Sequence, residues 1–344
     1  MMNKTMRNML IPGVVAVAVI LIPAMLIQTR IISGYPAQIL TLGALNAILA
    51  ISVNMVCGIT GQLSLGQAGF EALGAYAVVL LSTKLNVPLP VSVLLGGCVA
   101  ALFGFLIGFP TLKLEGDYLA IVTLAFCEII RAVMVNLKNI TGGPNGMQFS
   151  TVLTTSLVFG ATISYLSIMT ALVLIVVLLQ NFLHSTYGRA ILAVREDEVA
   201  ANSNGISVFR YKMIGFVIAS FIAGIAGALY APFIGFIQPK DFDFNASIND
   251  LIFVVLGGMG SITGGILAAF VLTALQEILR FLKDYRLLIY PVILIFVMLF
   301  RPQGLLGTRE LSFVNVYDGI PGFFRLLKTR LGGKKSGADK GAKE

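Results

Sequence analysis

The sequence of 344 residues contains little charge: Asp, Glu, Lys and Arg make up 12% of it, whereas 57% is hydrophobic. A mean hydropathy of +0.93 excludes a soluble globular protein, in which about a quarter of the residues are charged. The apolar residues form many runs of roughly 20 residues, the length at which a helix crosses about 30 Å of hydrocarbon. The sequence therefore predicts an all-α polytopic membrane protein.

Residues that carry chemistry are also scarce, since the chain has three cysteines and one histidine. The cysteines lie in apolar runs without CxxC spacing, which indicates packing residues rather than disulfides or metal ligands. No GxSxG, HExxH or GxxxxGK[ST] motif occurs. We therefore expect no catalytic residue, no metal site and no cofactor or ATP site in this chain.

We expect about ten transmembrane helices. The apolar runs are 9–27, 36–57, 64–82, 88–109, 118–136, 162–183, 211–237, 245–259, 262–282 and 286–300. The eighth and ninth runs would be one long segment without the glycine-rich stretch 257–261. With both basic ends of the chain on the cytoplasmic side, the number of crossings is even, so this stretch is predicted to be a turn between two passes.

The same reasoning divides the chain into a transmembrane domain, 1–305, and a basic cytoplasmic tail, 306–344. Nine of the 24 basic residues follow Phe300, which favours a contact with anionic lipid rather than with nucleic acid. The charged, glycine-rich end of the tail is predicted to be disordered. The largest cytoplasmic loop before it is 184–210.

Polar side chains within the third run are the first candidates for a transport pathway. Ser64, Gln67 and Glu71 have the spacing of one helix face, and Gln62 precedes them. Because polar groups in hydrocarbon are costly, this stripe must face the interior of the bundle. It either lines a passage or forms a hydrogen-bonded seam between closely packed helices.

Two spacings in neighbouring runs predict contacts. Glu128 and Arg131 stand three residues apart in the fifth run and are expected to pair, either as a structural ion pair or as part of the pathway. Gly104 and Gly108 form a GxxxG motif, which is typical of a helix face that packs closely against another helix. The chain also shows a weak internal repeat, since 59–63 and 262–266 are similar glycine-containing segments between two runs.

The loop from Arg189 to Gly205 is the most distinctive cytoplasmic segment. It is predicted to be helical as far as Ser203, with Gly205 ending the helix. It is either a solvated connector or a docking element for a cytoplasmic partner. Its Ala200, Ala201 and Gly205 match the AA-x3-G of the coupling segment in permeases of ABC importers, although Val199 stands at the usual Glu position.

Further segments extend this resemblance over residues 61–305. They are GQLSLGQA at 61–68, YLAIVTL at 118–124, TGGPNG at 141–146, LGGMGS at 256–261 and FRPQGL at 300–305. Together they resemble the LivM-type permease of branched-chain amino acid ABC importers. The resemblance implies a multi-pass subunit of the bacterial inner membrane with both termini in the cytoplasm.

It also implies a second, LivH-like permease, two cytoplasmic ATPase subunits that bind ATP and Mg²⁺, and a periplasmic binding protein. The implied ATPase contact is formed by Arg189, Arg195, Glu196, Asp197, Glu198, Ala200, Ala201 and Gly205. The implied docking site for the binding protein is formed by Thr141, Gly142, Gly143, Asn145, Lys240 and Asp241. Related permeases transport urea, short amides or other amino acids. A further alternative is a stand-alone secondary transporter, coupled to protons through Glu71 or the Glu128–Arg131 pair.

Overall fold

The computed structural model describes residues 20–21, 23–29, 34–114, 116–149, 159–301, 304 and 307. In the first half of the chain the helices are α2 (Tyr35–Val53), its π-helical continuation η1 (Asn54–Ile59), α3 (Gln67–Lys84), α4 (Leu89–Thr111), α5 (Asp117–Asn136) and α6 (Lys138–Thr141). Next come η2 (Gly143–Asn145), α8 (Phe159–His184), α9 (Thr186–Glu196), α10 (Glu198–Ser203) and α11 (Val208–Ile234). The last are η3 (Pro239–Phe242), α12 (Phe244–Gly257), α13 (Ile262–Ile278), η4 (Leu279–Tyr285) and α14 (Arg286–Phe300).

Hydropathy explains most of these helices. Among the described residues, six helical segments are long and apolar enough to cross a membrane: Tyr35–Ile59, Leu89–Thr111, Asp117–Asn136, Thr162–His184, Val208–Ile234 and Ile262–Phe281. Phe244–Gly257 and Leu288–Phe300 are shorter apolar helices. The chain is therefore an all-α, multi-pass membrane protein. Nine of the ten predicted runs coincide with helices. The remaining run, 9–27, lies largely outside the described residues, as do the basic N-terminal end that predicts the orientation and the tail 306–344.

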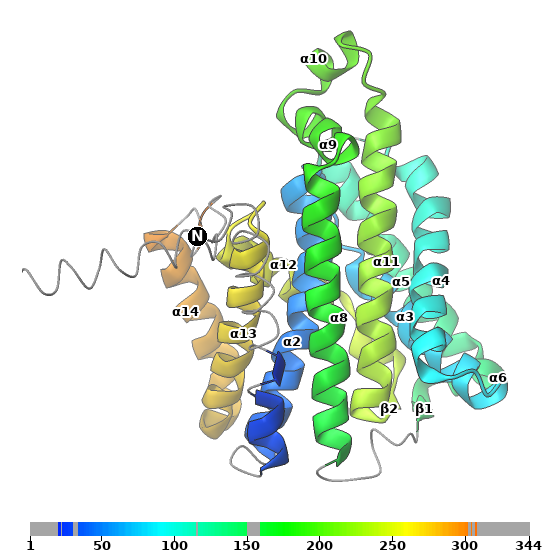
Figure 1. Ribbon diagram of the computed structural model, residues 1–344, viewed down its shortest axis with the longest axis vertical. Helices are drawn as coiled ribbons and strands as arrows, with labels where there is room; N and C mark the ends of the chain where they lie inside the picture. Colours follow the sequence, from blue (N-terminus) through cyan, green and yellow to red (C-terminus); the bar gives the residue numbers. More distant parts are fainter. Residues whose placement is uncertain are drawn as a thin grey trace, which may run out of the picture. The chain divides into compact units, whose positions relative to one another are not determined.

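The long helices pack side by side, and short elements lie at their two ends. Figure 1 shows α2, α8 and α11 next to one another, with α13 beside α2 and with α4 on the other side of α11. At one end, α9 and α10 project beyond α8 and α11. At the other, β1 (Met147–Gln148) pairs antiparallel with β2 (Phe236–Ile237). We call these the α9 end and the β end.

Glycines allow the central helices to approach one another closely. A Cβ atom on Gly104 of α4 would lie 2.4 Å from the Ser220 hydroxyl oxygen of α11, and one on Gly108 would lie 3.0 Å from the Met213 sulfur. The predicted GxxxG contact is thus confirmed, and its partner is α11. Further along α11, a Cβ atom on Gly227 would lie 1.9 Å from the Glu71 carbonyl oxygen of α3. These contacts pack α3, α4 and α11 into one unit.

Two breaks in the helices meet at the α9 end. The first lies between η1 and α3, and the second is the predicted turn between α12 and α13, which the structure confirms. The Gly260 N–H in the second break donates a hydrogen bond to the Asn54 Oδ1 atom at the start of η1 (2.8 Å). The two repeat segments lie at these breaks, since 59–63 starts at the last residue of η1 and 262–266 begins α13.

Candidate functional site

The projecting segment at the α9 end consists of two helices, where the sequence predicted one. Asp197 interrupts it with an extended backbone, and its Oδ1 atom accepts hydrogen bonds from the N–H groups of Val199 (2.8 Å) and Ala200 (2.9 Å). The prediction of a continuous helix to Ser203 is therefore wrong, because an Asp side chain at this position caps a new helix instead. Gly205 ends α10 with a left-handed φ of 81°, as expected. We call residues 185–206 the α9–α10 segment.

Three attachments hold this segment against the membrane helices. The turn from α8 is tight, since a Cβ atom on Gly188 would lie 2.4 Å from the Leu183 carbonyl oxygen. The apolar face of α9 is buried through Ile191 and Val194. At the other end of the segment, Glu198 forms an ion pair of 2.6 Å with Lys212 of α11. Motion of the segment would therefore act directly on α8 and α11.

The outer face of the segment is exposed and partly apolar. Val199 is 77% exposed, and Tyr187 and Leu192 are also exposed. Of the residues predicted to contact an ATPase, only Ala201 is buried; Arg189, Arg195, Glu196, Asp197, Glu198, Ala200 and Gly205 are exposed. Exposed apolar side chains beyond the membrane helices are typical of a protein-binding surface when they lie among charged residues.

The polar stripe of the third run faces the interior of the bundle, as predicted. Gln62, Ser64, Gln67 and Glu71 are all buried. The prediction that Ser64 shares a helix face with the others is wrong, because α3 begins only at Gln67. The chain before it is not helical: Gly61 has a φ of 71°, and the Leu65 N–H donates to the Thr123 hydroxyl (3.1 Å).

Gln67 takes part in a seam between helices. The Ser52 hydroxyl in α2 lies 3.1 Å from Gln67 Oε1 and 2.8 Å from the Ala219 carbonyl oxygen in α11. The Gln67 Nε2 atom and both amide atoms of Gln62 have no hydrogen-bond partner within the described chain. The Gln67 contact confirms the hydrogen-bonded seam, whereas the role of the stripe in lining a passage stays a prediction.

The structure adds polar residues from other helices that the sequence analysis did not single out. Asp250 of α12 is buried and is an electrostatic neighbour of Glu71. The Ser247 hydroxyl accepts from the Ala68 N–H (3.3 Å). The same search for polar residues inside apolar runs would have found both, because they lie within the run 245–259.

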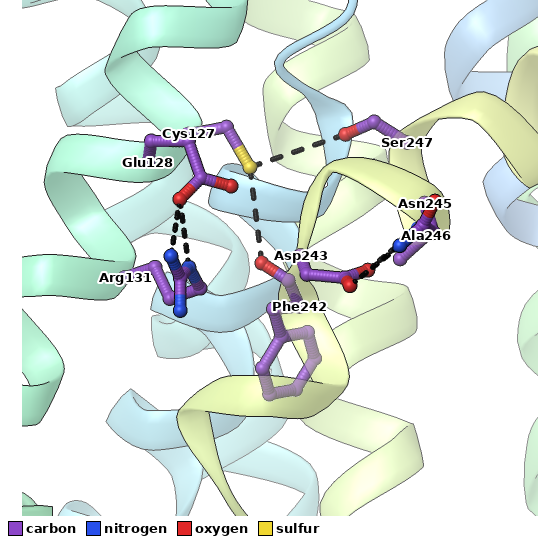
Figure 2. A network of polar contacts seen from close by, with 8 residues as sticks. All are labelled: Cys127, Glu128, Arg131, Phe242, Asp243, Asn245, Ala246 and Ser247. Atoms are coloured by element: carbon purple, nitrogen blue, oxygen red, sulfur yellow. Dashed lines mark hydrogen bonds and ion pairs between the residues drawn. The ribbon is translucent and has the colours of Figure 1, made fainter. Parts of the chain in front are cut away.

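The predicted ion pair forms, but it does not lie inside the bundle. The Arg131 Nη2 and Nε atoms are 2.6 Å and 2.8 Å from Glu128 Oε2, and the side chains are 39% and 37% exposed. Figure 2 shows this pair on α5, with Cys127 beside it turned towards Phe242 and Ser247. A half-buried charge pair on an apolar helix requires protein or water around its open side, because hydrocarbon does not solvate it.

The predicted docking loops come together at the β end. Met147 pairs with Ile237 and Gln148 with Phe236, so the loops after α5 and after α11 form one surface. Of the residues predicted for docking, Gly142, Asn145 and Lys240 are exposed, whereas Thr141 and Gly143 are buried and Asp241 is half-buried. The Thr141 hydroxyl donates to the carbonyl groups of Met134, in α5, and Leu137, just after it, and the Asp241 carboxylate accepts from Gln238. These last three residues shape the loops rather than their outer surface.

Comparison with known proteins identifies the family. Residues 35–299 match the profile of the branched-chain amino acid transport system permease component. The chain belongs to this family. The family consists of transport permeases rather than known enzymes, and the predicted resemblance to a LivM-type permease is confirmed.

Permease proteins named LivM, LivH and BraD are among the relatives. The high-affinity branched-chain amino acid transport system permease protein LivM of Escherichia coli K12 is 39% identical over 300 residues, which cover 80% of this chain and 71% of that protein. The LivH protein of Salmonella typhimurium is 25% identical over 79% of this chain and 94% of its own length. The BraD protein of Pseudomonas aeruginosa is 29% identical over 79% of this chain and 95% of its own length. No solved structure matches this chain.

Proposed function

We propose that this permease is the membrane-spanning subunit of an ATP-driven importer of branched-chain amino acids. The substrate class is that of the LivM, LivH and BraD relatives. The observation that carries the ATP-driven part is the projecting α9–α10 segment with its exposed Val199. Because the sequence has no Walker-type motif, the energy must come from other chains.

Four other subunits complete the proposed transporter. Two ATPase subunits bind ATP and Mg²⁺ and contact the α9–α10 segment, which places the α9 end and both chain termini in the cytoplasm of a bacterium and the chain in its inner membrane. A second, LivH-like permease lies against this one. A periplasmic binding protein delivers the substrate to the β end, where Asn145 and Lys240 are exposed.

The attachments of the α9–α10 segment provide the mechanism. When the ATPases close, they displace this segment, and the Gly188 turn and the Glu198–Lys212 pair pass the displacement to α8 and α11. α11 packs on α3, which carries Gln67 and Glu71. The nucleotide state of the ATPases therefore shifts the balance between two arrangements of the bundle, because each arrangement makes different contacts with the ATPases at the α9 end.

The test is purification of the complex in mild detergent with Val199→Asp in the permease. A charge on this exposed apolar position is expected to lower recovery of the ATPase at least tenfold, while the permease itself remains folded. Ile140→Asp provides the matched control, since Ile140 is an exposed apolar residue at the β end. Undiminished recovery of the ATPase with Val199→Asp would overturn the assigned contact.

A proton-coupled transporter is the second candidate, and the buried carboxyl groups of Glu71 and Asp250 favour it. The two candidates make opposite predictions in proteoliposomes. The ATP-driven importer requires ATPase subunits and ATP, whereas a proton-coupled transporter moves leucine when the purified chain alone experiences a proton gradient. Repeating the ATP-driven assay with urea or acetamide, each with its own binding protein, tests the other substrate classes.

A further inference from the structure

Arg195 of α9 lies against both helix breaks at the α9 end. A Cβ atom built on Gly61, in the first break, would be 3.1 Å from Arg195 Cγ and 3.7 Å from its Cβ. A Cβ atom built on Gly260, in the second break, would be 3.0 Å from the Nη1 atom of the same side chain. The stem of Arg195 therefore packs on one break and its guanidinium group packs on the other.

Glycine is favoured at both positions for two reasons. Gly61 and Gly260 have φ angles of 71° and 93°, in the left-handed region that side chains disfavour. A side chain at either position would also displace Arg195, since the contacts of 3.1 Å to its Cγ atom and 3.0 Å to its Nη1 atom are tighter than ordinary van der Waals contacts. The local sequence thus permits an arginine to lie directly on backbone.

The second break also contacts η1, the helix that leads into the first break. A Cβ atom on Gly58 would lie 2.4 Å from the Gly260 nitrogen, so no side chain fits between them. The hydrogen bond from the Gly260 N–H to Asn54 adds a directional link. A force applied to either break by Arg195 would therefore reach α2, α3, α12 and α13 together.

We infer that Arg195 is the positioning residue that transmits movement of α9 to the two breaks, so that the helices flanking the buried stripe move with the ATPases. This inference rests on the proposed function. The other attachments of the α9–α10 segment lead to α8 and α11. Through Arg195 the segment also reaches the breaks, from which α3, with Gln67, and α12, with Asp250, extend into the bundle.

The first experiment is Arg195→Ala in the complete complex, reconstituted with its ATPases, second permease and binding protein. We expect the ATPases to co-purify, because the Arg195 side chain packs on the two breaks, and leucine transported per ATP to fall at least tenfold. Arg195→Lys should restore part of this ratio, because lysine keeps the stem over Gly61. Lys113→Ala, which removes a positive charge next to the end of α4, should leave the ratio unchanged.

An unchanged transport ratio in Arg195→Ala would overturn the inference. Loss of ATPase co-purification would also overturn it, because Arg195 would then be a docking residue. Failure of the proposed function has a different signature, since the wild-type chain would then recover no ATPase at all.

A disulfide provides the second experiment. The distance of 3.7 Å between the two Cβ positions matches the separation of about 3.8 Å in disulfides. Gly61→Cys with Arg195→Cys, in a background with the native cysteines replaced, should therefore cross-link on oxidation. If α9 and the first break move together, the oxidised complex transports more leucine per ATP than Arg195→Cys alone.

Two results would contradict this second expectation. Transport that stops on oxidation and returns with a reductant would show that α9 must separate from the break. A folded double variant that does not cross-link would show that the two residues are not neighbours.

Discussion

The Glu198 carboxylate of α10 and the Lys212 ammonium group of α11 form an ion pair of 2.6 Å across the Gly205 turn. α10 has six residues, and so short a helix is not stable by itself. Its position therefore depends on this pair, on the Asp197 cap and on the buried Ala201. The most exposed apolar residue of the segment, Val199, is held in place by the same contacts.

Exchanging the two charges separates a positioning role of this pair from direct contact with an ATPase. Glu198→Lys places two ammonium groups together and should weaken ATPase binding, as measured by co-purification. Adding Lys212→Glu restores the pair and should restore most of the binding, whereas Glu198→Gln should cost no more than about 1 kcal/mol, or roughly fivefold. If the exchange restores nothing, Glu198 itself contacts the partner.

Gln67→Leu is expected to impair transport more than stability. The Ser52 hydroxyl keeps its bond to the Ala219 carbonyl when the Gln67 amide is removed, and a hydrogen bond between membrane helices contributes only about 0.6 kcal/mol on average. The melting temperature should therefore change by a few degrees at most while leucine uptake falls. Ser52→Ala is the control for the seam alone, and a large loss of stability in Gln67→Leu would assign Gln67 a structural role.

Gly104→Ala should strongly destabilise the permease, because the new Cβ atom would lie 2.4 Å from the Ser220 hydroxyl oxygen. Adding Ser220→Gly removes that clash and should recover part of the lost thermal stability. The recovery is incomplete because glycine within a helix costs about 1 kcal/mol. Gly265→Ala is the matched control, since its Cβ atom would meet Ala50 at an ordinary 3.9 Å. Equal melting temperatures for the two alanine variants would contradict the close packing of α4 on α11.

Single and double leucine variants of the Glu128–Arg131 pair test whether the pair is structural or part of the pathway. Glu128→Leu leaves Arg131 charged and unpaired in an apolar helix, which costs at least about 2.5 kcal/mol on insertion scales. The yield of folded permease should fall, and the double variant Glu128→Leu with Arg131→Leu should restore it. Transport by the double variant then decides the role: normal uptake indicates a structural pair, and lost uptake places the pair on the pathway.

Several parts of the site followed from local sequence. The burial of Gln67 and Glu71 was predictable because polar residues in an apolar run must avoid hydrocarbon. The helix stop at Gly205 was predictable because few other residues adopt its left-handed backbone. The interruption at Asp197 was missed because capping by Asp competed with a continuous helical pattern, and the position of Ser64 was missed because Leu65 bonds to Thr123, on a different helix.

The sequence by itself determined the membrane class, the position of nine apolar helices and the turn between α12 and α13, because the hydropathy of a run of about 20 residues is a local property. It also carried the family resemblance. The tertiary structure alone decided that Arg195 rests on Gly61 and Gly260, that Asp250 interacts electrostatically with Glu71 and that Glu128 and Arg131 are only half-buried. Such contacts depend on how distant helices pack, and close packing through glycine leaves no periodic signal in the sequence that names the partner.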